Sequence, residues 1–105
     1  MQPIIVYMTF ANAQAASEII RVLLDECLIA CANIFAPATS FYRWQGKIEQ
    51  VQETVVIAKS RKELFSLLVE RVKGLHSYDC PCIVSWEIGE GNPDFLRWIG
   101  EETIS

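Results

Sequence analysis

The fold of this chain is decided by one stretch near its start, Pro3–Phe10, which reads PIIVYMTF. This short run of β-branched and aromatic side chains is typical of a buried strand rather than of a helix. Its two sides carry Ile4, Val6 and Met8 on one and Ile5 and Tyr7 on the other. A strand with one face in water would alternate apolar with polar residues. Both faces of this strand are therefore predicted to be covered.

Five further elements and a helical tail follow this strand. They are a helix over Ala13–Leu28, extended segments over Ala30–Ile34 and Thr39–Trp44 interrupted at Ala36-Pro37, a return strand over Lys47–Lys59, a helix from Ser60 to about Lys73, a strand over Cys82–Ile88, and a terminal helix opened by Pro93. Gln45-Gly46 stands where a two-residue hairpin loop would join the long strands. This βαββαβ order predicts the ferredoxin-like fold, an α+β architecture with two helices on one face of a four-stranded antiparallel sheet.

Local patterns predict the helix boundaries. Asn12 is placed to cap the first helix, and Cys27 continues the apolar stripe of that helix to its end. Ser60 and Glu63 have the spacing of a capping box, in which each side chain satisfies a free backbone NH group of the other residue. We therefore expect the second helix to begin at Ser60.

The sheet face away from the helices has no cover of its own in this fold. The return strand is apolar on both sides, with Val55 and Ile57 opposed to Val56 and Ala58. If about six such side chains stayed wet, forgoing about 1.5–3 kcal/mol each, the loss would rival a domain's stability of about 5–15 kcal/mol. We expect another subunit to cover this face. A charge placed there, at Val56 or Val6 according to the side that the structure assigns, should dissociate or unfold the protein.

Composition restricts the class of protein. With 51% hydrophobic and 21% charged residues, the chain is predicted to form one folded domain over residues 1–105. A net charge of -4 argues against nucleic acid as a partner, because it repels phosphate backbones. Without a long apolar run or a basic segment at its start, the chain is expected to have no membrane partner and no export signal. The four cysteines are expected to be reduced thiols in a cytoplasmic protein.

Several sites hosted by this fold are missing from the sequence. The loop Thr9–Ala13 has neither the glycine and arginine of a phosphate-binding loop nor a Cys-x-x-Cys metal motif. An RNA-binding sheet needs aromatic residues on a basic face, whereas this chain is acidic and its strands are largely aliphatic. Cys31 and His76 are a conceivable nucleophile and base, but a cysteine in an apolar run is more typical of packing. We therefore expect no enzymatic activity.

A polar and aromatic group surrounds the predicted hairpin. Its members are Trp44, Lys47, Glu49, Glu53, Lys59, Tyr78 and Trp98. Charged residues on strands are more often solvated, and tryptophans are more often packed in a core or an interface. Lys59 differs because it ends the apolar run Val55–Ala58, and a lysine there is expected to have a carboxylate partner such as Glu53.

Several segments together resemble the CutA family of divalent-cation tolerance proteins. They are Ala30–Ile34 (ACANI), Ser40–Glu49 (SFYRWQGKIE), Glu53, Lys59-Ser60 and His76–Pro81 (HSYDCP). Each segment alone is a weak signal, but their joint occurrence in this order is specific and spans almost the whole chain. The resemblance implies a ferredoxin-like subunit in a tight homotrimer, without enzymatic activity, in which the long hairpin and the last strand help to build sheets between subunits.

The resemblance also implies intersubunit clefts. These clefts are lined by residues that match Trp44, Glu53, Lys59 and Tyr78. We include Cys31 and Trp98 as further candidates for the cleft. Family members are linked to tolerance of copper and other divalent cations. Some bacterial members carry a cysteine at the position of Met8 and a second histidine at the position of Leu75, so this chain lacks part of that copper ligand set.

The donors that remain predict a copper site of a different composition. They are His76, Met8, Cys80 and Cys82. Soft thiolate and thioether ligands favour Cu(I) over hard cations, so copper is the metal expected if one is bound. The alternative is that Cys80 and Cys82 only pack at the start of a strand. Two functions therefore remain open: a trimeric protein that binds or responds to metal ions, and a trimeric sensor or adaptor that holds a small ligand or partner in its clefts.

Overall fold

The computed structural model describes residues 1–104 and folds them in the predicted order. The strands are β1 (Pro3–Phe10), β2 (Cys31–Trp44), β3 (Lys47–Arg61) and β4 (Ile83–Glu87). The helices are α1 (Ala13–Asp25), the short 3-10 helix η1 (Lys62–Leu64), α2 (Phe65–Leu75) and α3 (Pro93–Glu101). The predicted bounds of β1 are confirmed. The predicted interruption in β2 is a register shift between Phe35 and Ala38, at the cis peptide bond of Ala36-Pro37.

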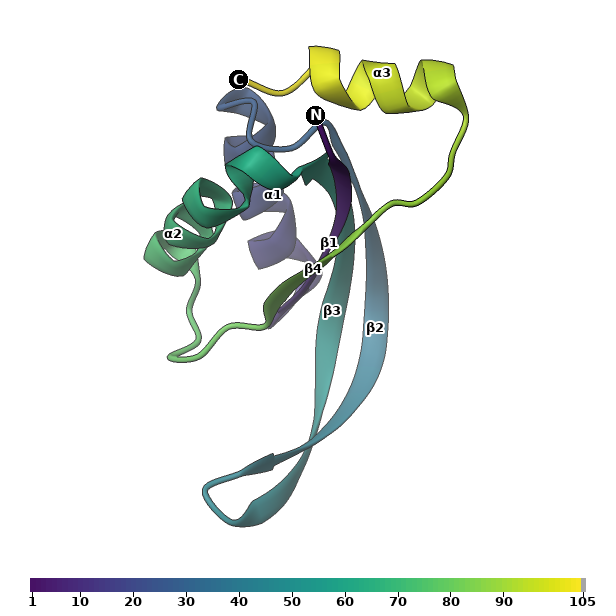
Figure 1. Cartoon of the computed structure of the whole chain (residues 1–105). Coiled ribbons are helices and arrows are strands. Elements are labelled where there is room, and N and C mark those ends of the chain that lie inside the picture. Colours follow the sequence, from purple (N-terminus) through teal and green to yellow (C-terminus); the bar gives the residue numbers. More distant parts are fainter. Residues whose placement is uncertain (105) are drawn as a thin grey trace.

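All four strands belong to one antiparallel sheet in the order β2-β3-β1-β4. Figure 1 shows α1 and α2 together on one side of this sheet, while α3 lies past the end at which β1 begins. The predicted α+β arrangement, with both internal helices on one face, is therefore confirmed. Within residues 1–104, the other sheet face carries no helix.

The hydrophobic core lies between the sheet and these two helices. Its buried side chains include Ile4, Val6 and Met8 of β1, Val56 and Ala58 of β3, Ile19, Ile20 and Leu23 of α1, and Leu68 and Val72 of α2. The strand register sets Val6 opposite Ala58 and Met8 opposite Val56. Val6 and Val56 both lie on the helix side, so the expectation that one of them marks the uncovered face is wrong.

We call the opposite side of the sheet the bare face. It carries Ile5 and Tyr7 of β1, Phe35 of β2, Val55, Ile57 and Lys59 of β3, and Val84 and Trp86 of β4. Phe35, Val84 and Trp86 remain 52%, 50% and 49% exposed. Large apolar side chains gathered on one exposed face are typical of an interaction surface. The two-sided apolar pattern of the strands thus leaves this face wet in a single chain.

Beyond the sheet body, β2 and β3 continue as a two-stranded ribbon, the arm, which spans residues 38–53. β1 pairs with β3 only from Thr54 to Arg61, so the arm part of β3 pairs with β2 alone. The arm projects far from the rest of the molecule in Figure 1 and leaves Phe41 67% and Ile48 73% exposed. An isolated two-stranded ribbon is marginally stable in water. The arm is therefore the part of the sheet that this chain supports least.

The end of α1 differs from the prediction. The helix stops at Asp25, and Cys27 adopts a left-handed conformation with φ of 59° instead of continuing the apolar stripe. The backbone NH of Leu28 donates to the Leu23 carbonyl and that of Cys27 donates to the Leu24 carbonyl. These two bonds form a Schellman motif, which reverses the chain at a helix end. A cysteine in place of the usual glycine hides that signal in the sequence.

The predicted capping box at the second helix is also wrong. Ser60 lies within β3, opposite Ile4 of β1, and its buried hydroxyl donates to the Leu28 carbonyl at 2.6 Å. β3 continues to Arg61, η1 follows, and α2 begins only at Phe65. Strand pairing and a buried hydrogen bond therefore outweigh the local helix-start signal at Ser60.

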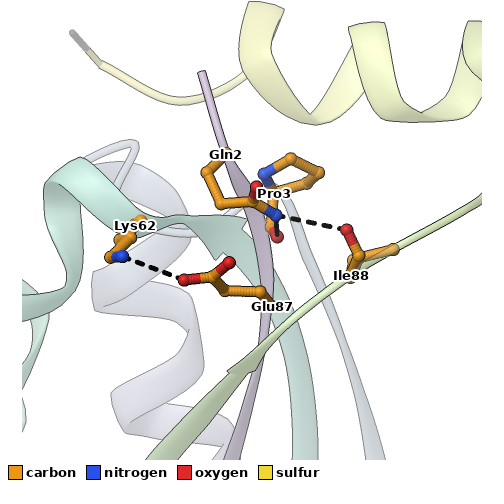
Figure 2. Close-up of polar contacts among 5 residues, drawn as sticks. All are labelled: Gln2, Pro3, Lys62, Glu87 and Ile88. Atoms are coloured by element: carbon orange, nitrogen blue, oxygen red, sulfur yellow. Dashed lines mark hydrogen bonds and ion pairs between the residues drawn. The ribbon is translucent and has the colours of Figure 1, made fainter.

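Polar contacts fasten the short edge strand β4 at the start of the sheet. The Gln2 side-chain amide donates to the carbonyls of Pro3 at 2.8 Å and Ile88 at 3.2 Å, as Figure 2 shows. Lys62 of η1 pairs with Glu87 of β4 at 2.9 Å in the same view. Exposed ion pairs of this kind contribute little to stability. These contacts lie at Glu87 and Ile88, where the chain leaves β4 for α3.

The loop at the tip of the arm generates the first prediction. Gln45 and Gly46 form the predicted two-residue loop, and their positive φ values of 52° and 81° are those of a type I′ turn. A residue other than glycine pays up to about 1–2 kcal/mol in this conformation, and asparagine tolerates it best. Gln45→Asn should therefore raise the free energy of unfolding by about 0.5 kcal/mol in urea denaturation. Gln50→Asn, within β3, should give no gain, and a loss of stability in Gln45→Asn would contradict this turn.

Candidate functional site

A cleft of about 700 Å³ opens where the arm leaves the sheet. It lies between the arm, the end of β1 and the loop that joins α2 to β4. Its walls include Thr9 of β1, Trp44 of β2, Glu53 of β3, and Tyr78 and Cys82 of the loop. Three of the six predicted cleft residues, Trp44, Glu53 and Tyr78, are thus brought together within one chain.

Glu53 is the most buried charged group of this cleft. Its side chain is only 8% exposed, and the Tyr78 hydroxyl donates to its Oε2 atom at 2.8 Å. Glu53 comes from the point at which the arm joins the sheet body, whereas Tyr78 comes from the loop after α2. This hydrogen bond therefore connects the arm to the loop across the cleft.

His76 positions Tyr78. Its Nε2 atom donates to the Thr9 carbonyl at 2.8 Å, because a carbonyl oxygen can only accept, and its Nδ1 atom accepts from the Tyr78 backbone NH at 3.1 Å. The imidazole ring also stacks on Phe10, with ring centroids 4.8 Å apart. His76 thus uses both ring nitrogens to hold the loop against the end of β1.

The protonation of Tyr78 follows from this environment. Burial first, and then the hydrogen bond to Glu53 and its negative charge, raise the pKa of Tyr78 to about 12. The phenol therefore stays protonated at neutral pH and keeps donating to the carboxylate.

Cys80 and Cys82 line the same cleft, and both thiols are free. Burial raises the pKa of the Cys82 thiol, and the neighbouring charges of Glu53 and Cys80 raise it further. Cys82 therefore stays protonated at neutral pH, which makes it a weak nucleophile. A metal ion bound there would have to displace the proton.

The predicted donor group of His76, Met8, Cys80 and Cys82 is not assembled. Met8 is fully buried on the helix side of the sheet, and both ring nitrogens of His76 are occupied by backbone groups. Within residues 1–104, no group of three or more histidine, cysteine, aspartate or glutamate side chains could hold a metal ion. Cys80 and Cys82 are the soft donors left at the cleft.

Comparison with known proteins agrees with this fold and site. The family model described as "CutA1 divalent ion tolerance protein" matches residues 4–102. The chain belongs to the CutA1 family. The match covers nearly all of β1 and extends past the end of α3, and it confirms the resemblance inferred from the sequence motifs.

Relatives in distant organisms share the whole fold. A divalent-cation tolerance protein CutA of Pyrococcus horikoshii is 45% identical over 95% of this chain and 97% of its own. The crystal structure of CutA1 from Oryza sativa superimposes with a TM-score of 0.96 at 35% identity, covering 99% of this chain and 95% of that chain. The periplasmic divalent cation tolerance protein CutA of Archaeoglobus fulgidus superimposes with a TM-score of 0.92 at 41% identity, covering 95% and 97%.

The other three predicted cleft residues lie outside the cleft of this CutA1 family member. Cys31 and Lys59 are paired in the β2–β3 register, and Lys59 is six residues, or about 20 Å, from Glu53 along β3. The Lys59 ammonium donates to Asn33 Oδ1 at 3.1 Å, so its expected pairing with Glu53 within one chain is wrong. Trp98 lies on α3 and is 37% exposed.

Sequence reasoning missed part of the aromatic wall. Tyr7, Phe41 and Tyr42 line the cleft beside Trp44. Tyr42 precedes Trp44 by two residues, so period-two spacing on a strand was the available signal. The approach of the α2–β4 loop to the arm depends on tertiary contacts through His76, which no local pattern reveals.

One further structural observation is that no helix within residues 1–104 is long and apolar enough to cross a membrane.

The Glu53–Tyr78 contact generates the second prediction. Glu53→Gln should lower the pKa of Tyr78 from about 12 toward its ordinary value of 10.0, because the substitution removes the negative charge. Absorbance titration of tyrosinate measures this change, with Tyr78→Phe assigning the transition and Glu49→Gln, a carboxylate outside the cleft, as control. Since the folded-state pKa is raised, the stabilisation is fully present below about pH 10 and is lost as the pH rises through about 12. An unchanged Tyr78 transition in Glu53→Gln would refute the contact.

Proposed function

We propose that this CutA1 family member acts in divalent-cation tolerance as a non-enzymatic homotrimer that binds or responds to metal ions, copper first. The observation that carries this proposal is the family match over residues 4–102, together with relatives named as divalent-cation tolerance proteins. The proposal includes a cytoplasmic location, which is supported by four cysteines that form no disulfide. The relative from Archaeoglobus fulgidus is named as a periplasmic protein, so the two proteins would occupy different compartments under this proposal.

The homotrimer is supported by the surfaces that a single chain leaves wet. The bare face exposes Val84 and Trp86, and the arm exposes Phe41 and Ile48. Burying these side chains against other copies provides the apolar contact that the sheet and the arm lack. Cys31, Lys59 and Trp98 lie outside the cleft of their own chain. In the proposed trimer, they would therefore line the cleft of a neighbouring copy.

The absence of enzymatic activity is supported by the state of the reactive groups. Cys31 lies on the bare face, whereas His76 is held by two backbone groups at the end of β1. The nucleophile and base considered from the sequence are therefore separated. The Cys82 thiol has a raised pKa, which disfavours the reactive thiolate.

Copper is supported by the two thiols of Cys80 and Cys82. Thiolate ligands select Cu(I), and the nearby carboxylate of Glu53 adds negative charge to the same cleft. Two thiols leave further ligand positions for a neighbouring copy of the chain. Because the pKa of Cys82 is raised, affinity should increase with pH as its proton becomes easier to displace.

Assembly is tested at Ile57, which lies on the bare face of β3. Wild-type protein should give a native mass of three times the 11.9 kDa chain. Ile57→Asp should give folded monomer, because an unpaired carboxylate buried in an interface costs several kcal/mol. Ile57→Val should remain a trimer. Val56→Asp, one residue away but in the core, should unfold the chain, which circular dichroism distinguishes from dissociation. A wild-type monomer, or a trimer of unchanged stability in Ile57→Asp, would refute the assembly.

Copper binding is tested by anaerobic titration of reduced protein with Cu(I) against a competing chelator. Cys80→Ser and Cys82→Ser should each weaken binding by at least about tenfold, because each removes a soft donor. Cys27→Ser, outside the cleft, serves as the matched control and should leave affinity unchanged. Equal affinity in all variants would place the metal elsewhere, and failure of the wild type to compete would refute copper binding.

A second function is favoured by the size and walls of the cleft. A volume of about 700 Å³ falls within the range of small-molecule sites and is far larger than one metal ion requires. In this alternative, the homotrimer is a sensor or adaptor whose clefts hold a small ligand or a partner segment. Copper is then incidental, and a ligand that binds with both cysteines replaced by serine distinguishes this function from the first.

A further inference from the structure

The cleft that holds Cys80 and Cys82 opens onto the bare face. Tyr7 of β1 belongs to the bare face and also lines the cleft. Thr9, two residues further along the same strand, lines the cleft as well. Alternate residues of a strand share one side of a sheet, so the cleft is the arm end of the bare face. A copy that covers the bare face in the proposed homotrimer therefore also contacts the cleft.

Two charged residues on this side of the sheet complement each other between copies. Glu53 is 8% exposed and accepts from the neutral Tyr78 hydroxyl, and the Lys59 ammonium donates to the neutral Asn33 amide. Neither charge belongs to an ion pair formed among residues 1–104. They lie about 20 Å apart along β3, so they can pair only between chains. Since the contacts in a three-fold ring join different patches of two copies, this complementarity favours Lys59 of one copy at Glu53 of the next.

Cys31 accompanies Lys59 on the bare face. The strand register sets Cys31 of β2 opposite Lys59 of β3. Side chains paired in this way have their Cβ atoms about 4.5–5.5 Å apart. The Cys31 thiol is free and partly exposed in a single chain. A lysine that reaches Glu53 of a neighbouring copy therefore brings a thiol to the same cleft.

The copper donors of the cleft are incomplete within one chain. Cys80 and Cys82 are separated only by Pro81, and both line the cleft. Within residues 1–104, no three histidine, cysteine, aspartate or glutamate side chains gather where they could hold a metal ion. The chemistry of the two thiols fits Cu(I), which soft sulfur ligands select. The ligand still missing from this pair has to come from another chain.

We propose that each copper site is shared between two copies, with Cys80 and Cys82 of one copy and Cys31 of the next copy as three thiolate ligands of Cu(I). The inference rests on the copper-binding form of the proposed function, for which it names the third ligand. Lys59 and Glu53 align the two copies, and the lysine charge offsets part of the negative charge of the thiolates. Each thiol releases its proton on binding. The complete site exists only in the assembled protein.

X-ray absorption at the copper edge and anaerobic Cu(I) titration test the third ligand. The wild-type trimer should show three sulfur ligands. Cys31→Ser should show two and bind Cu(I) at least about tenfold more weakly. In the Ile57→Asp monomer, Cys31→Ser should change neither quantity, because the neighbouring copy is already absent. Cys27→Ser is the matched control. Unchanged affinity in a Cys31→Ser trimer, verified by native mass and circular dichroism, would overturn the proposal.

Mixed trimers distinguish a shared site from one built within a single chain. One parent carries Cys31→Ser, and the other carries both Cys80→Ser and Cys82→Ser, so neither parent trimer has a complete site. Equal co-expression should restore wild-type affinity in about a quarter of the clefts, because each cleft needs the two kinds of subunit in a fixed order. No restoration, in a sample whose native mass spectrum contains mixed trimers, would contradict the shared site.

Proximity of the thiols is tested without copper by dibromobimane, a short reagent that joins two thiols. A variant that keeps only Cys31 and Cys82 should give covalently linked trimer on a denaturing gel. A variant that keeps only Cys27 and Cys82 should give none. Absence of linked product in a confirmed trimer would contradict the proposal. Equal Cu(I) affinity in wild-type and Cys31→Ser trimers refutes the shared site alone, whereas a wild-type trimer that fails to compete for Cu(I) refutes copper binding as well.

Discussion

The structure depends on one constraint, which is that a sheet with apolar side chains on both faces can be covered on only one side by its own helices. α1 and α2 cover the side that carries Val6 and Val56. The other side carries Ile5, Ile57 and Trp86, and the described part of the chain, residues 1–104, has no further element that covers it. Apolar area left in water costs about 25 cal/mol per Å². The strand and helix connections are thus complete within one chain, but one face of the sheet stays exposed. A second copy of the chain is the simplest way to cover that face.

The arm and the cleft follow from the same constraint. β2 and β3 extend past β1, so residues beyond Thr54 have no third strand to pair with. At that boundary, the loop after α2 reaches the arm through Tyr78, held in turn by His76. The cleft therefore forms where the sheet body ends and the unsupported ribbon begins. Its carboxylate and thiols lie beside the surfaces that other copies cover in the proposed homotrimer, so that proposal links assembly to ligand binding.

The sequence predicted the elements that depend on local patterning and failed where distant contacts decide. β1 matched to the residue because its β-branched run has no competing interpretation. Ser60 looked like a helix cap, but pairing with Ile4 and a bond to Leu28 keep it in the sheet. Met8 was proposed as a metal ligand because the sequence placed it on a strand but did not show which face of the sheet it occupies. Lys59 and Glu53 seemed near in sequence, yet six residues of extended strand separate them by about 20 Å.

The central claim is that the arm is stable only because other copies of the chain cover it, and amide hydrogen exchange along residues 38–53 tests this claim most directly. An isolated ribbon opens easily, so its amides exchange rapidly. The account predicts that the arm amides of wild-type protein are protected nearly as strongly as those of β1, and that this protection is lost on dilution or in an assembly-defective variant. Arm amides that exchange within seconds in concentrated wild-type protein, while β1 stays protected, would contradict it.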